Sequence, residues 1–162
     1  MSTTAALADV AVLLAHAWLA AASVVLTVVD MRTHRLPDRV VLPGYVVAVL
    51  LFGVAALLDA DAEPLLRAVV AGAALFGGFL LLRIASPAGL GGGDVKLAGV
   101  VGLFLGHAGW EAVPAGLLAA FLLGGLCALA LVATRRARGS TALAFGPFLL
   151  FGAWCGILAA GA

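Results

Sequence analysis

Long runs of apolar residues, separated by short polar or charged segments, make up most of the chain. Within each run the apolar residues occupy all faces of a helix, which is typical of helices that contact both lipid and protein. A spanning helix needs about 20 residues, and the runs predict six transmembrane helices, over 10–29, 40–58, 65–83, 94–110, 112–134 and 141–161. We therefore predict an all-α polytopic membrane protein, with residues 1–162 forming a single transmembrane domain without an internal repeat.

The third and fourth predicted helices reach a spanning length only if they include charged residues. The third must begin near Leu65, so Arg67 lies inside it and is expected to extend its guanidinium to the lipid headgroups. The uncharged part of the fourth rises only about 21 Å, at ~1.5 Å per residue, against a hydrocarbon core of about 30 Å. It must begin near Asp94, which brings Asp94 and Lys96 to the membrane boundary.

The composition agrees with a membrane protein, because hydrophobic residues make up 65% of the 162 positions and charged residues only 10%. A net charge of +1 gives no basic surface for nucleic acid, so no nucleic-acid partner is expected. Cys127 and Cys155 lie inside apolar runs, which favours neither a disulfide nor a zinc site. We expect no metal and no cofactor. The first run lacks a cleavage signal and is expected to be retained.

The basic residues concentrate in alternate connecting segments, which predicts the orientation in the membrane. Loops rich in Lys and Arg stay in the cytoplasm. Eight of the nine Lys and Arg residues lie near the segments that join helices one to two, three to four and five to six: Arg32, Arg35, Arg39, Arg83, Lys96, Arg135, Arg136 and Arg138. The other side contains Arg67 among acidic residues. Both termini are therefore predicted to be non-cytoplasmic, in the inner (cytoplasmic) membrane.

Two carboxylates from remote parts of the sequence are predicted to lie at the same membrane depth. Asp30 follows the first helix on its inward path, and Asp94 begins the fourth helix from the same side. Two carboxylates within a few ångströms disfavour being charged together, so such a pair shares a proton. One group can then deprotonate a water molecule while the other donates a proton to a carbonyl oxygen. The pair is a candidate catalytic site.

The glycines just before Asp94 favour a close approach of another backbone. Gly89, Gly91, Gly92 and Gly93 lack a side chain, so an extended peptide can approach the aspartate. The run is not a phosphate-binding loop, because it lacks the GK[ST] ending and follows a membrane span where that loop requires a strand.

Structural interpretations of these charged residues remain open alternatives. Asp94 can serve as an N-cap of the fourth helix, and Asp30 can end the first helix and pair with Arg32 or Arg35. Lys96 is expected to be an interfacial anchor or a partner of Asp94.

Other polar and small residues also have simple structural interpretations. Asp38 can cap the second helix. His16 is an ionisable residue in mid-span and hence a site hypothesis, although a neutral histidine hydrogen-bonded to another helix is favoured. Pairs of glycines at four-residue spacing predict close helix packing within the chain, with dimerisation as the weaker alternative: Gly102 with Gly106, and Gly152 with Gly156.

Three segments together resemble a known family of membrane proteases. The sequence DMRTHRLPDRVVLPGY at 30–45 resembles the first block of the type IV prepilin peptidases, in which a helix-ending aspartate precedes an LPD-like element. The sequence GLGGGDVKLAGVVGLFLG at 89–106 resembles their GxGD block, with GxGD at 91–94 followed by a lysine. FGPFLLFGAW at 145–154 resembles the FGPxL element of their final helix.

The resemblance implies an intramembrane aspartic endopeptidase that removes the basic leader of pilin-like precursors on the cytoplasmic side. Cleavage in this family follows a glycine just before the hydrophobic segment. Asp30 and Asp94 match the catalytic pair, and four further residues match the surrounding motifs as supporting positions: Pro37, Gly91, Gly93 and Lys96. The expected partners are a pilin-like precursor and the lipid bilayer.

The chain is more similar to the short members of this family than to the bifunctional ones. Bifunctional relatives carry an additional N-terminal region and methylate the new N-terminus, whereas here only nine residues precede the first apolar run. The short members serve Flp-type (tight-adherence) pili, and archaeal preflagellin peptidases share their layout. We therefore expect cleavage of Flp-type precursors without N-methylation.

Two other classes of function are alternatives to the peptidase. A small proton-coupled transporter also places carboxylates in the membrane, but transport sites usually lie near the midplane at repeat interfaces. An assembly subunit that uses its glycines only for packing leaves the two matched aspartates unexplained.

Overall fold

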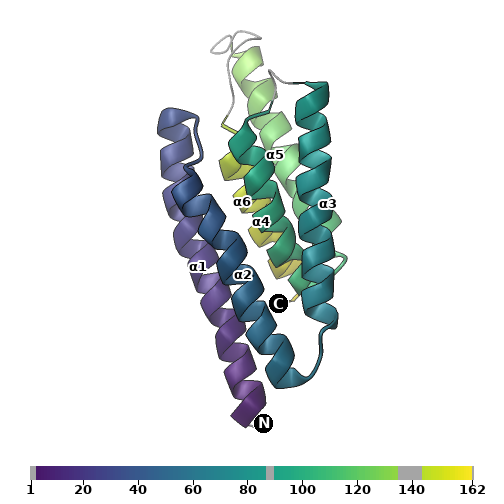
Figure 1. Ribbon diagram of the computed structural model, residues 1–162. Helices are drawn as coiled ribbons and strands as arrows, with labels where there is room; N and C mark the ends of the chain where they lie inside the picture. The colour runs from purple at the N-terminus through teal and green to yellow at the C-terminus, as the bar shows by residue number, and fades with distance from the viewer. Residues whose placement is uncertain (1–2, 87–89, 135–143, 162) are drawn as a thin grey trace.

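The computed structural model describes residues 3–86, 90–134 and 144–161, and over these ranges the chain forms six α-helices and no strand. The helices are α1 (Thr3–Thr33), α2 (Asp38–Asp59), α3 (Glu63–Ala85), α4 (Gly92–Ala108), α5 (Ala112–Ala133) and α6 (Gly146–Ala159). Figure 1 shows α1 and α2 as a long antiparallel pair beside the other helices. The all-α prediction is confirmed.

Four helices are long and apolar enough to cross a membrane: α1, α2, α3 and α5. Each exposes large apolar side chains on its outer face, among them Leu13, Leu57, Leu81 and Leu126. Such extensive apolar surface is unfavourable in water and fits contact with lipid. The protein is therefore a multi-pass membrane protein.

The shorter helix α4 lies at the centre of the bundle. It contacts α2, α3, α5 and α6, and every residue from Leu97 to Gly106 is buried. Its 17 residues rise about 26 Å at ~1.5 Å per residue. Because protein surrounds α4 on most sides, its length does not have to match the thickness of the hydrocarbon core.

Glycines let the central helices approach closely. A Cβ at Gly102 of α4 would lie 2.7 Å from the carbonyl oxygen of Ala71 and from the Cα of Gly72, both in α3. A Cβ at Gly152 of α6 would similarly collide with the carbonyl oxygen of Gly116 in α5. The prediction that the four-residue glycine pairs pack helices within the chain is confirmed.

Several helix ends differ from the predicted bounds. The first helix extends at both ends beyond 10–29, so Asp30 lies inside its last turns and does not terminate it. The described part of the last helix is Gly146–Ala159, whereas the predicted start at 141–143 lies outside the described residues. Gly89 lies outside them as well, as do three arginines of the topology argument: Arg135, Arg136 and Arg138.

Two polar side chains differ from their predicted roles. Arg67 does not reach for headgroups: its guanidinium donates to the carbonyl oxygens of Gly106 and His107, at 2.6 and 2.9 Å, and pairs with Glu63. It satisfies free carbonyls at the C-terminal end of α4. The His16 Nδ1 atom lies 2.9 Å from the carbonyl oxygen of Val12 in its own helix, so the predicted bond to another helix is wrong.

The two ends of the bundle differ in charge. The end of α1 and the start of α2 lie near the end of α3 at the top of Figure 1, and the N-terminus lies at the bottom. The described basic residues of the top end are Arg32, Arg35, Arg39, Arg83 and Lys96. Acidic residues gather around Arg67 at the other end: Asp9, Asp59, Asp61, Glu63 and Glu111.

The close packing of α3 and α4 predicts that Gly102→Ala destabilises the protein. The new methyl group would meet backbone atoms of α3 at 2.7 Å, and overpacking of this kind costs about 1–3 kcal/mol. We expect a lower midpoint of thermal unfolding in detergent micelles. The matched control is Gly78→Ala in α3, where a Cβ meets no atom within 4 Å. Equal midpoints for the two variants would contradict the assigned packing.

Candidate active site

Two carboxylates are buried in the bundle. Asp30 is 4% exposed and Asp94 is 9% exposed, and no other charged side chain in the described part of the chain is buried. Burial of a charged group is unfavourable unless hydrogen bonds or opposite charges compensate for the lost water. The surroundings of these two residues therefore determine what they can do.

Asp30 lies on the buried face of α1. The buried residues of this helix recur every three or four positions: Ala8, Ala11, Ala15, Leu19, Ala22, Leu26 and Asp30. This spacing keeps them on one face of a helix, so the aspartate continues an otherwise apolar stripe into the protein. Its Oδ2 atom accepts a hydrogen bond from the backbone N–H of Gly146, at 3.1 Å.

Asp94 lies in the first turn of α4. The helix begins at Gly92 after Gly91, and the Asp94 Oδ2 atom accepts a hydrogen bond from the Gly91 backbone N–H, at 3.1 Å. Asp94 therefore stabilises the helix start from inside the first turn. The alternative that it is the N-cap residue is wrong, because Gly91 occupies that position.

Both carboxylates line one polar cavity of about 290 Å³. It is bordered by the end of α1, the segment before α2 and the start of α4: Asp30, His34, Arg35, Leu36, Asp38, Gly91, Gly92, Gly93 and Asp94. The charges of Asp30 and Asp94 repel each other electrostatically. The cavity exceeds the ~30 Å³ of one liquid water molecule several times, so it can admit water and part of a peptide.

The glycine segment brings three parts of the chain together around this cavity. A Cβ at Gly93 would lie 2.7 Å from the Cβ of Leu36, in the α1–α2 connection. A Cβ at Gly92 would collide with the guanidinium of Arg83 at the end of α3. The start of α4 can lie against both neighbours because these positions carry no side chain.

Lys96 pairs with Asp38. The Lys96 Nζ atom lies 2.8 and 2.7 Å from the two carboxylate oxygens of Asp38, and the Tyr45 hydroxyl donates to the Lys96 carbonyl oxygen at 2.7 Å. These contacts connect α2 to the start of α4. Lys96 therefore pairs with Asp38 and not with Asp94, the partner suggested by the sequence.

Asp38 does not cap α2. The residue before the helix is Pro37, with φ −71° and ψ 126°, and no side chain caps this end. The Pro37 carbonyl accepts the first backbone hydrogen bonds of the helix, from Val40 and Val41. The carboxylate of Asp38 therefore makes no hydrogen bond to the start of its own helix and instead binds the Lys96 ammonium.

The predicted alternative for Asp30, an ion pair with Arg32 or Arg35, is not formed. Across residues 3–86, 90–134 and 144–161 the ion pairs within 4.0 Å are Arg67–Glu63 and Lys96–Asp38. Within these residues no group of three His, Cys, Asp or Glu side chains could hold a metal ion. The two buried carboxylates in the cavity, Asp30 and Asp94, are therefore not engaged in an ion pair with any described residue. Two such carboxylates can perform acid–base chemistry on water.

The backbone donor at Gly146 is the contact that analysis of the residues missed. Only the similarity of 145–154 to a family motif directed attention to this segment, and nothing in its composition places it beside Asp30. The buried face of α1 that ends at Asp30 was likewise not predicted, because apolar residues occupy all faces of this helix in the sequence.

Comparisons with known proteins identify the family of this chain. The model of the type IV leader peptidase family matches residues 17–129, which include both aspartates. The prepilin leader peptidase/N-methyltransferase of Pseudomonas putida is 32% identical over 136 residues, covering 82% of this chain and 45% of that protein. The relative of the same name from Aeromonas hydrophila is 33% identical over 138 residues, covering 83% and 46%.

A third relative of that name, from Burkholderia pseudomallei, is 37% identical over 144 residues, covering 83% of this chain and 42% of the relative. The chain spans about half the length of the curated relatives it matches. No solved structure matches the chain. The family match extends over most of the chain and contains the two buried carboxylates, so this protein belongs to the type IV leader peptidase family.

Proposed function

We propose that this protein is an intramembrane aspartic endopeptidase that cleaves the basic leader peptide from type IV pilin-like, Flp-type precursors. Asp30 and Asp94 activate the attacking water. The observation that carries the proposal is that these two residues, buried and far apart in sequence, line a single polar cavity. Membership in the leader peptidase family supplies the substrate class.

The proposed reaction follows the chemistry of paired carboxylates. One ionised aspartate takes a proton from water, whose oxygen attacks the carbonyl carbon of the scissile peptide bond. The other aspartate, protonated, donates its proton to the carbonyl oxygen. When the C–N bond breaks, the leaving amine takes up a proton from the carboxyl that received one from water. The carbonyl group re-forms as one hydroxyl of the tetrahedral intermediate returns its proton to the aspartate that had donated one, which restores both carboxyl groups. No cofactor or metal takes part in this scheme.

The hydrogen bonds from the two glycines hold the carboxylates in position for this reaction. Gly146 and Gly91 each donate a backbone N–H to one carboxylate oxygen, Oδ2. Within the described part of the chain, the second oxygen of each carboxylate accepts no hydrogen bond from the protein, so it is free to bind water or substrate. A group that is fixed by the backbone does not lose side-chain freedom during the reaction, which favours catalysis.

The proposed topology has six membrane spans in the inner membrane and both termini on the non-cytoplasmic side. The described basic residues near the aspartates support a cytoplasmic position for the cavity, as does the acidic character of the opposite end. A cytoplasmic cavity suits a substrate whose basic leader remains in the cytoplasm.

A proton-coupled transporter is less well supported. Asp30 lies in the last turns of α1 and Asp94 in the first turn of α4, so both lie at one end of their helices. Transport sites usually lie near the middle of the membrane.

Replacing either aspartate tests the proposed mechanism directly. Asp30→Asn or Asp94→Asn removes the ionisable group and keeps the size of the side chain. A positioned acid or base contributes roughly 10²–10⁴-fold to the rate, so we expect cleavage of a co-expressed pilin-like precursor to fall at least about a hundredfold. The gel shift of the processed precursor measures this.

The matched control for the aspartate variants is Asp59→Asn, an exposed carboxylate at the other end of the bundle, which we expect to process the precursor normally. Membrane fractionation checks that all variants insert. Retained processing in either active-site variant would remove that residue from the catalytic role.

Gly146→Ala is expected to reduce cleavage while the protein still folds. The new Cβ would lie 2.7 Å from the Asp30 Oδ2 atom, so the carboxylate must move away from the backbone N–H. Hydrogen bonds to charged groups contribute about 1.5–3 kcal/mol, so we expect a loss of at least about tenfold in kcat/KM. The control is Gly125→Ala, where a Cβ meets no atom within 4 Å. Equal activity of both variants would show that the Gly146 contact is dispensable.

The Lys96–Asp38 pair is expected to position the start of α4 and not to react. Both side chains are partly exposed, at 40% and 54%, and exposed pairs contribute little. We expect Lys96→Gln and Asp38→Asn each to lower cleavage by less than about tenfold, mainly in kcat. The exchanged double variant, Lys96→Asp with Asp38→Lys, should recover part of the activity. A loss as large as that of the aspartate variants, without rescue, would contradict a positioning role.

A further inference from the structure

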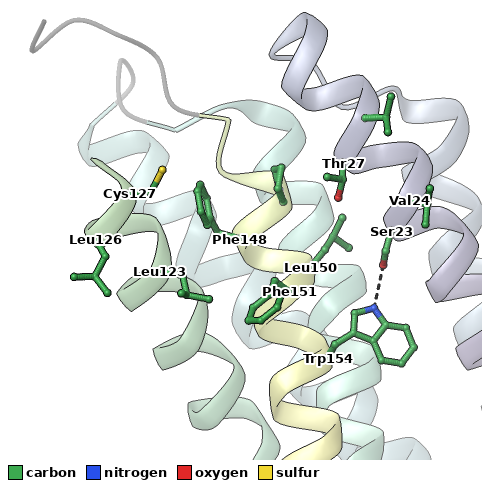
Figure 2. Close-up of a pocket in the computed structure, with 12 residues that line it drawn as sticks. Ser23, Val24, Thr27, Leu123, Leu126, Cys127, Phe148, Leu150, Phe151 and Trp154 are labelled. Carbon is green, nitrogen blue, oxygen red and sulfur yellow. Dashed lines mark hydrogen bonds between the residues drawn. The ribbon is translucent and has the colours of Figure 1, made fainter. Parts of the chain in front are cut away.

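An apolar groove extends along the bundle beside α6. It has a volume of about 910 Å³. In Figure 2, α6 lies between α1 and α5, so its side chains form the floor of the groove while the other two helices form its walls. The lining consists of Ser23, Val24, Thr27, Val28, Leu123, Leu126, Cys127, Pro147, Phe148, Leu150, Phe151 and Trp154.

The groove opens to the side of the bundle. Several lining side chains are largely exposed, among them Val24 at 66% and Leu126 at 61%. Its polar atoms are few, and two of them are paired with each other: the Trp154 indole N–H donates to the Ser23 hydroxyl at 3.2 Å, as Figure 2 shows. Among the described residues, the lining contains no Asp, Glu, Lys, Arg or His. A charged peptide therefore gains nothing by entering it.

One end of the groove lies close to the carboxylate cavity along α1 and α6, although no described residue lines both. On α1 the lining ends at Val28, two residues before Asp30. On α6 it begins at Pro147, directly after Gly146, whose N–H binds Asp30. The Ser23–Trp154 hydrogen bond lies farther along both helices, away from Asp30. The groove thus leads from the aspartate into the membrane-spanning part of the bundle.

We infer that this groove binds the hydrophobic segment of the precursor that follows the scissile bond. The inference rests on the proposed function. Backbone at membrane depth must form its own hydrogen bonds, so the segment enters as a helix. A helix with side chains is about 10–12 Å wide, so only one of its apolar faces occupies the groove and the rest faces lipid.

The polar cavity and the groove complement the two parts of such a substrate. The polar cavity, which contains Asp30 and Asp94 together with His34 and Arg35, receives the scissile peptide. The groove, free of charged side chains, receives the apolar helix. Because the groove ends within two residues of Asp30 on α1 and directly after Gly146 on α6, a helix bound in the groove would bring the junction of leader and helix close to Asp30. The groove therefore selects the precursor and sets the position of cleavage.

Filling the groove tests the inference. Val24→Trp and Leu126→Trp each place a large ring in it, at positions exposed enough to accept one. The matched controls are Val25→Trp and Leu129→Trp, on the same helices at 47% and 65% exposure but outside the lining. The probe is a precursor with a basic leader that ends in glycine and an apolar helix of about 20 residues, reconstituted with each variant in phospholipid vesicles.

We expect kcat/KM to fall at least about tenfold for the two groove variants and to stay within about twofold of wild type for the controls. Unfolding midpoints in detergent verify that all four variants fold. Equal activity of groove and control variants would overturn the inference and leave the peptidase proposal intact. Failure of the wild-type protein to cleave the probe would instead contradict the peptidase proposal.

A photo-cross-linking amino acid at Phe151, in the Asp94→Asn background, gives a second measurement that does not depend on cleavage. We expect an adduct with the apolar helix of the precursor, mapped by mass spectrometry, and none from the same amino acid at Leu129. Adducts with phospholipid alone at Phe151 would identify the groove as a lipid site and overturn the inference.

Discussion

A carboxylate buried in a membrane protein must find hydrogen-bond donors within the protein, and this requirement explains the arrangement around Asp30 and Asp94. Side-chain donors are scarce in a chain with 10% charged residues. The donors are instead backbone N–H groups near the first turns of α4 and α6, where a helix leaves such groups unpaired. Gly91 and Gly146 supply them. The hydrogen bonds from Gly91 to Asp94 and from Gly146 to Asp30 therefore stabilise the starts of α4 and α6.

The enclosed position of α4 follows from the same requirement. A helix that carries a buried carboxylate in its first turn cannot expose that turn to lipid. Surrounding α4 with four other helices keeps Asp94 in a protein environment. Helices can pack closely around α4 only where the residues between them are small. At Gly102 the backbones of α4 and α3 lie so close that a larger residue would not fit. The position of the buried carboxylate Asp94 and the packing against α3 thus depend on the same short helix.

Much of this fold could be predicted from the sequence because hydrophobic runs and the distribution of basic residues follow simple physical rules. The runs indicate membrane helices, and the basic residues divide the connecting segments into two sets on opposite sides of the membrane. The positions of Asp30 and Asp94 at one membrane depth follow from the alternating path of the helices. These inferences need only the local sequence and the dimensions of the bilayer.

Contacts between remote side chains could not be predicted in this way. The partner of Lys96 was expected to be the nearby Asp94 and is Asp38, 58 positions away. Arg67 was expected at the headgroups and instead binds carbonyl oxygens at the end of α4. Both errors have one cause. Each of these two side chains binds a group on another helix, and the sequence alone does not determine which helix lies beside it.

Under the proposed function, the site belongs at one end of the bundle, where a polar cavity and an apolar groove lie close together. Hydrolysis needs water, which the apolar middle of the membrane excludes, whereas recognition of an apolar helix needs a surface inside the membrane. Both needs are met only at the boundary, where the apolar stripe of α1 ends in a carboxylate. Moving Asp30 one turn deeper would separate it from water, and moving it one turn outward would separate it from the groove.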